Sequence, residues 1–66
     1  MDDDFNMSMR KFLKQVGVTS QQAIEGAIRS AGPKAAGQSF PVRVVLTIEG
    51  LDLVHTVDGT ITGPSA

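Results

Sequence analysis

The sequence predicts an α+β domain in which two N-terminal helices pack on one face of a C-terminal antiparallel β-hairpin (ααββ). Three observations predict it. Apolar residues recur at helical spacing up to Ala31, Gly17 and Gly32 interrupt that pattern, and strict alternation begins after Phe40. With 66 residues the chain makes a single small domain. A chain this short buries only about 60% of the surface that its unfolded form exposes, so a monomer has little margin of stability.

The first helix is expected over about residues 4–16. Its apolar residues stand at offsets of 4, 7, 8 and 11 from the first, which is the stripe of an amphipathic helix: Phe5, Met9, Phe12, Leu13 and Val16. The acidic residues that precede the stripe suit the positive end of the helix dipole. Gly17 supplies the left-handed residue that ends many helices, so a break is predicted there.

The second helix is expected over about residues 20–31. Thr19 and Gln22 have the spacing of a capping box, which marks a helix start. The apolar face of this helix consists of Ala23, Ile24, Ala27, Ile28 and Ala31. Gly32 and Pro33 then end the helix.

The antiparallel hairpin is expected at about residues 41–49 and 52–58, where apolar side chains fall at every second position. The turn lies near Gly50. A two-residue loop would pair Val44 with His55, whereas a four-residue loop would pair it with Val57. Both registers keep the same residues on the apolar face, because the shift between them is even.

Two segments are expected to be less regular. Residues 32–40, which are rich in glycine and other small or polar residues, read as a flexible connector. Residues 63–66 are expected to form a frayed tail.

Charge and composition exclude several classes of protein. Six basic and seven acidic side chains give a net charge of −1, so no global field draws the chain to nucleic acid or to an anionic membrane. There is no cysteine, no apolar run long enough to cross a bilayer, and an acidic N-terminus where a secretory signal would be basic. We therefore expect a soluble cytoplasmic protein with no membrane association. A monomer is slightly favoured over a homodimer, although the hairpin has free edges.

Several stretches of the chain resemble a family of short uncharacterised bacterial proteins. They are Phe5-Asn6-Met7-Ser8, Arg10-Lys11-Phe12-Leu13-Lys14, Val16-Gly17-Val18-Thr19-Ser20-Gln21, Val45-Leu46-Thr47-Ile48 and Gly50-Leu51. The similarity covers roughly residues 5–62. It implies a stand-alone bacterial protein of unknown function and brings no activity, cofactor or binding residue with it.

The alternative function is a DNA-binding regulator of the helix-turn-helix type. Gly17 would be the turn glycine and Thr19–Ala31 the recognition helix. Leu13 stands where that motif carries a small residue. The outward face offers one arginine, Arg29, which is matched to Glu25 one turn earlier, and this is little to hold a phosphate backbone. Nucleic acid is therefore not expected as a partner.

His55 is the one histidine, and it alternates with Leu53 and Val57 on the apolar side of the second strand. The neighbouring carboxylates, Asp52 and Asp58, lie at odd offsets and face the other way. A half-buried structural histidine near the sheet edge is expected rather than a catalytic base. We predict that the protein is not an enzyme, with no catalytic residue, no cofactor and no metal site.

One surface remains unexplained by the fold. At 100° per residue, Arg10, Lys11 and Lys14 cluster on the side of the first helix opposite the apolar stripe, and Met7 falls among them. The plain interpretation is the solvated side of an amphipathic helix. Methionine among cations also makes an adaptable contact surface for an acidic partner. The sequence therefore predicts a protein-binding or interaction module whose unknown protein partner contacts these four residues.

Overall fold

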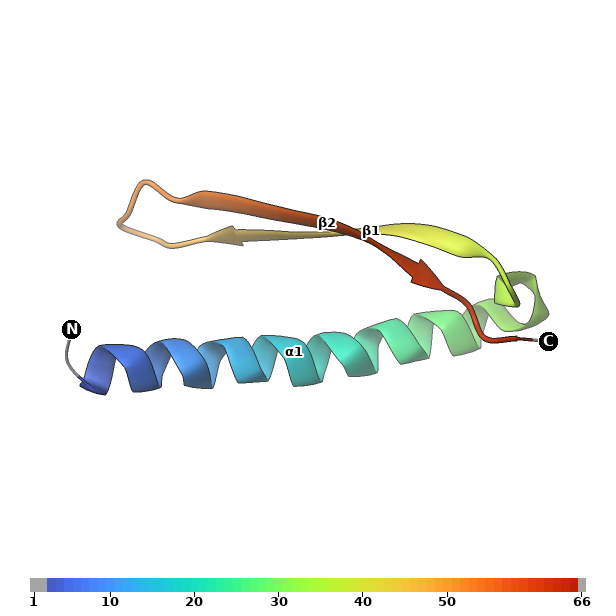
Figure 1. Cartoon of the computed structure of the whole chain (residues 1–66), viewed down its shortest axis with the longest axis horizontal. Coiled ribbons are helices and arrows are strands. Elements are labelled where there is room, and N and C mark those ends of the chain that lie inside the picture. The colour runs from blue at the N-terminus through green and yellow to red at the C-terminus, as the bar shows by residue number, and fades with distance from the viewer. Residues whose placement is uncertain (1–2, 66) are drawn as a thin grey trace. The chain divides into compact units, whose positions relative to one another are not determined.

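The computed structural model describes residues 3–65 and has an α+β architecture (Figure 1). Along the chain come a helix, a short 3-10 helix and two strands: α1 (Asp3–Ala31), η1 (Gly32–Ala35), β1 (Ser39–Thr47) and β2 (Val54–Thr62). α1 belongs to one compact unit, and the segment from Gly32 onward forms a second one.

α1 is one uninterrupted helix of 29 residues, so the prediction of two helices at 4–16 and 20–31 is wrong. Gly17 lies inside this helix and does not have the positive φ that a helix-ending glycine adopts. Thr19 does not cap a second helix. Its hydroxyl donates a hydrogen bond of 2.7 Å to the carbonyl oxygen of Gln15 one turn earlier, which is the contact of a threonine within a helix.

The continuity of α1 has a basis in the apolar pattern. The offsets that lead from Phe5 to Met9, Phe12, Leu13 and Val16 lead from Val16 to Ser20, Ala23, Ile24 and Ala27. The two apolar stripes therefore share one phase, with a repeat of eleven residues. Such a repeat corresponds to about 3.67 residues per turn, so the stripe stays on one side of a straight helix throughout.

The end of α1 agrees with the sequence. Gly32 has a φ of 66°, the left-handed conformation that stops a helix after its last turn. Pro33 follows within η1, so the chain does not return to the α-helical hydrogen-bond pattern.

The hairpin pairs β1 with β2 antiparallel, from Ser39 opposite Thr62 to Thr47 opposite Val54. Val44 lies opposite Val57, so the register expected for a four-residue loop is confirmed and the pairing of Val44 with His55 is wrong. Leu46 is half-buried whereas Val45 is 57% exposed, as the predicted alternation requires.

The strand boundaries differ from the predicted 41–49 and 52–58. β1 stops at Thr47 because the carbonyl oxygen of Ile48 accepts a turn hydrogen bond of 3.1 Å from the Leu51 N–H. β2 continues to Thr62 because Gly59 stays in the ladder, opposite Val42. The strands are thus displaced away from the turn rather than shortened.

The buried centre of the second unit is a turn packed against the end of β2. Ala35 is 0% exposed, and Gly63 is buried as well. The Gly63 N–H donates to the Gln38 carbonyl oxygen at 2.7 Å, and the Gly37 N–H donates to the Pro64 carbonyl oxygen at 2.9 Å.

Backbone hydrogen bonds join the connector to the tail. Within residues 32–40 the chain forms η1 and then enters β1 at Ser39. Within residues 63–66, Gly63 and Pro64 are hydrogen-bonded to the connector, and Ala66 lies outside the described residues.

Candidate functional site

None of the side chains that the structure describes in α1 is buried. Its apolar stripe is exposed at large residues, with Phe12 at 52% and Leu13 at 50%. A stripe of this length on a helix is a surface that takes part in packing. The side of α1 opposite the stripe carries the residues predicted to bind a partner.

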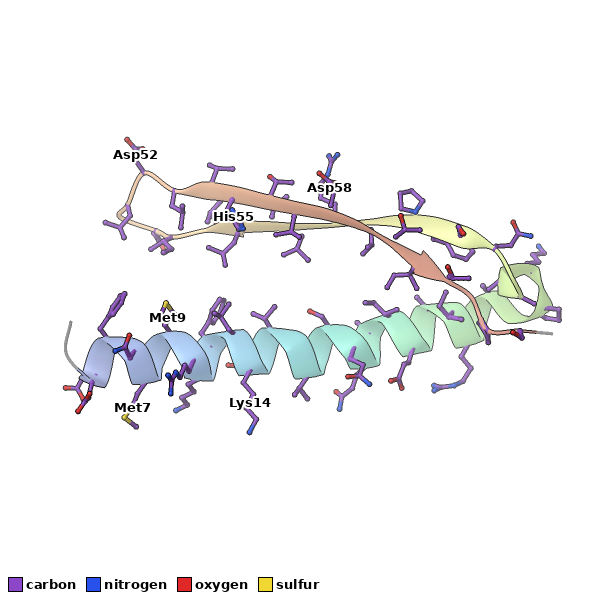
Figure 2. All side chains as sticks on the ribbon, in the orientation of Figure 1. Met7, Met9, Lys14, Asp52, His55 and Asp58 are labelled. Atoms are coloured by element: carbon purple, nitrogen blue, oxygen red, sulfur yellow. The ribbon has the colours of Figure 1, made fainter. Side chains whose placement is uncertain are left out.

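That opposite side is the basic face, which consists of Met7, Arg10, Lys11 and Lys14. All four side chains are exposed, and Met7 reaches 67%. Figure 2 shows Met7 and Lys14 projecting from the side of α1 away from Met9, a stripe residue. The structure thus brings the four predicted residues together on one helix surface, about 100° wide at the helical angle of 100° per residue.

The cations of the basic face have no carboxylate partner among residues 3–65. The ion pair found in that part of the chain joins Arg43 to Asp58, at 2.7 Å between Nε and Oδ1. In the sequence, no aspartate or glutamate occurs from Phe5 to Ile24, whereas this stretch holds three of the six basic side chains. The local potential at the basic face is therefore positive, although the whole chain carries −1.

His55 lies in β2 opposite Leu46, on the apolar face that Val44 and Val57 share. Its side chain is exposed, so the expectation of a half-buried histidine is wrong. The carboxylate of Asp58 is on the other face of the ladder, where it accepts the hydrogen bond from Arg43. Asp52 lies in the turn before β2 (Figure 2).

These groups do not converge on one point, because they belong to opposite faces of the hairpin and to its turn. Among the residues that the structure describes, no three carboxylate or imidazole groups gather as ligands for a metal ion. Within the same range, no helix combines the length and the apolar character needed to cross a bilayer.

The helix-turn-helix interpretation is wrong, because α1 has no turn at Gly17 and so offers no separate recognition helix. The predicted pairing of Glu25 with Arg29 is wrong too. Glu25 instead accepts a hydrogen bond of 3.0 Å from Gln21 Nε2, one turn toward the N-terminus. α1 therefore presents no surface with the helix-turn-helix geometry that the DNA-binding alternative required.

The comparisons with known proteins identify a family. The model of DUF6494, a family of unknown function, matches residues 1–64, so the chain belongs to that family. No curated protein and no solved structure matches the chain. The resemblance to an uncharacterised family that the sequence indicated is confirmed.

Proposed function

We propose that this DUF6494 protein is a protein-binding module, and that the basic face of α1 binds an acidic surface of its partner. One observation carries the proposal: Arg10, Lys11 and Lys14 lie exposed on one side of α1 with no carboxylate partner in the described chain. Groups that stabilised the fold through charge would be paired, as Arg43 is with Asp58.

The chemistry of the basic face suits an acidic protein surface. Three cations at helical spacing attract such a surface over a distance of about one Debye length, which raises the association rate. Met7 adds an unbranched apolar side chain that can adjust to a neighbouring contact. A helix holds the four groups in fixed positions, so binding orders only their side chains.

Two properties of this module stay predictions from the sequence. One is that the helical segment packs on the apolar face of the hairpin. The other is that the compartment is the bacterial cytoplasm. Neither is needed for the basic face to bind a partner.

The triple substitution Met7→Ser, Arg10→Ser, Lys14→Ser tests the proposal. Because all three side chains are exposed, stability should change by no more than about 1 kcal/mol. Partner proteins captured from a native bacterial lysate should fall at least about ten-fold, equivalent to about 1.4 kcal/mol of binding. Capture by the unmodified chain should also weaken as salt is raised, because charge carries the contact. The measurement is quantitative mass spectrometry of the captured proteins.

A matched control is Gln15→Ser, Gln22→Ser, Arg29→Ser. These are three exposed positions of α1 outside the basic face, and one of them is a cation. The control should retain capture. A folded triple variant that retrieves the same partners in the same amounts refutes the proposal. So does a loss of capture that is equal in the control.

A further inference from the structure

The turn of the hairpin is an exposed acidic surface between β1 and β2. This hairpin tip consists of Ile48, Glu49, Gly50, Leu51, Asp52 and Leu53. All six residues are exposed. In the sequence, no lysine or arginine occurs from Val44 to Val57, so the two carboxylates of the tip make the local potential negative.

The backbone of the hairpin tip has a defined turn geometry. The Leu51 N–H donates a hydrogen bond of 3.1 Å to the Ile48 carbonyl oxygen. Gly50 has a φ of 90°, the left-handed conformation that the third residue of a type II turn adopts. This turn presents Glu49 and Asp52 to solvent, and Figure 2 shows Asp52 at the turn end of the hairpin.

The other carboxylates in the described chain each have a role within their own element. Two of them lie in the first turn of α1, where the helix dipole favours negative charge. Glu25 accepts the hydrogen bond from Gln21, and Asp58 is paired with Arg43. The two carboxylates of the hairpin tip have neither kind of partner among residues 3–65.

The hairpin tip and the basic face are complementary in charge. The basic face holds three cations in a stretch without carboxylates, and the tip holds two carboxylates in a stretch without lysine or arginine. Each surface also has an apolar side chain that is 67% exposed, Met7 on the basic face and Leu51 on the tip. Surfaces of opposite charge steer their encounter and fix its orientation. The chain itself therefore carries an acidic surface of the kind that the basic face is proposed to bind.

We propose that the hairpin tip of one copy of the chain binds the basic face of another copy. The inference rests on the proposed function, because it names a second copy as the partner of the basic face. The two surfaces differ and every copy has one of each, so the contact is heterologous. A single turn on a helix buries less area than a standard interface, and the association is therefore weak and concentration-dependent. It departs from the monomer that the sequence slightly favoured.

The first test reverses the charge of each surface in the full chain. The face variant is Arg10→Glu, Lys14→Glu. The tip variant is Glu49→Lys, Asp52→Lys. All four side chains are exposed, so both variants should fold. Sedimentation equilibrium of the unmodified chain from about 50 μM to about 1 mM should give an average mass that rises above 7.0 kDa. Each variant alone should associate at least about ten-fold more weakly, because like charges then meet.

The matched control is the combined variant, which carries all four substitutions. It reverses two cations and two carboxylates, so its net charge stays at −1, as in the unmodified chain. Its two surfaces are again opposite in charge. It should therefore associate at least about three-fold more strongly than the face variant or the tip variant. Recovery at constant net charge would come from the pairing of these two surfaces.

The second test needs no substitution and stands even if a variant does not fold. In ¹⁵N NMR spectra of the unmodified chain, the amide shifts of residues 7–14 and 48–53 should change together as the protein concentration rises. Added salt should reverse these changes, because it screens the charges. The amides of Ala35 and Gly63 in the buried turn should keep their shifts.

Three results would overturn the inference. One is a single 7.0 kDa species for the unmodified chain up to about 1 mM. Another is a folded combined variant that associates no better than the face variant or the tip variant. The third is a set of concentration-dependent shift changes that leaves out either surface.

The proposed function is judged separately, by capture from the lysate. If the purified chain is monomeric and the triple substitution still removes the captured proteins, the basic face binds another protein and only the contact between copies is refuted. If the folded triple variant retrieves the same proteins in the same amounts, the proposed function itself is refuted.

Discussion

Replacing Gly63 with alanine is expected to destabilise the second unit by about 2 kcal/mol or more. A Cβ on Gly63 would overlap the carbonyl oxygen of Ala35 and lie 2.8 Å from its carbonyl carbon. Both are backbone atoms, so the overlap can be relieved only if the turn moves away from the end of β2. That movement stretches the hydrogen bonds that join Gly63 to Gln38 and Gly37 to Pro64.

The measurement is hydrogen exchange of ladder amides such as Val57 and Ile61, whose N–H groups point into the hairpin and report its opening free energy. The matched control is Gly17→Ala, where an added Cβ meets nothing within 4 Å. That control should stabilise α1 by about 0.5–1 kcal/mol, because alanine is the better helix former. Unchanged protection of both amides in Gly63→Ala would show that the turn is not packed as described.

Replacing Ser20 with proline is expected to cost α1 about 3 kcal/mol or more and to lower the helix content of the chain. Ser20 lies in the middle of the helix, where proline removes a hydrogen bond to Val16 and clashes with its carbonyl group. If a second helix began after Gly17, Ser20 would instead stand near its first residue, where proline is favoured.

Asp4→Pro is the control for this substitution, because the N–H groups of the first helical turn have no partner within the helix. Far-UV circular dichroism during thermal unfolding measures both variants. Asp4→Pro should keep nearly all of the helix signal and Ser20→Pro should not. If Ser20→Pro kept as much of the helix signal as Asp4→Pro, the result would support an interruption of the helix near Gly17.

The sequence predicted which N-terminal residues are helical, but it did not predict that they form one continuous helix. The apolar spacing identified both segments, and the outward positions of Met7, Arg10 and Lys14 follow from the helical angle alone. The break was inferred from Gly17 and the capping-box spacing of Thr19, which are local signals. The stripe keeps its phase across Gly17, and this longer-range pattern agrees with the structure better than either of them.

In the hairpin, the alternation predicted which side chains share a face, and the even-loop requirement left two registers, of which one is correct. The strand ends were less predictable. Pro41 was the predicted start of the first strand and Gly59 lay just past the predicted end of the second, yet a glycine opposite Val42 and a proline with an outward-facing nitrogen both fit inside a two-stranded ladder.

The buried turn had no signal in the sequence. Ala35 and Gly63 are distant along the chain, and small residues near a terminus are typical of a tail. Only the return of β2 to the start of β1 brings them together. The function of the basic face likewise stays a prediction, since exposure places its residues without naming the partner.

The central structural claim, that α1 is a single helix from Asp3 to Ala31, is tested most directly by NMR. The measurement is the ¹³Cα secondary chemical shift of each residue from Gln15 to Ser20. We predict uninterrupted helical values through Gly17, with negative φ at that glycine. Values that return to the random-coil range at Gly17 and Val18, or a positive φ at Gly17, would contradict it and restore a two-helix chain.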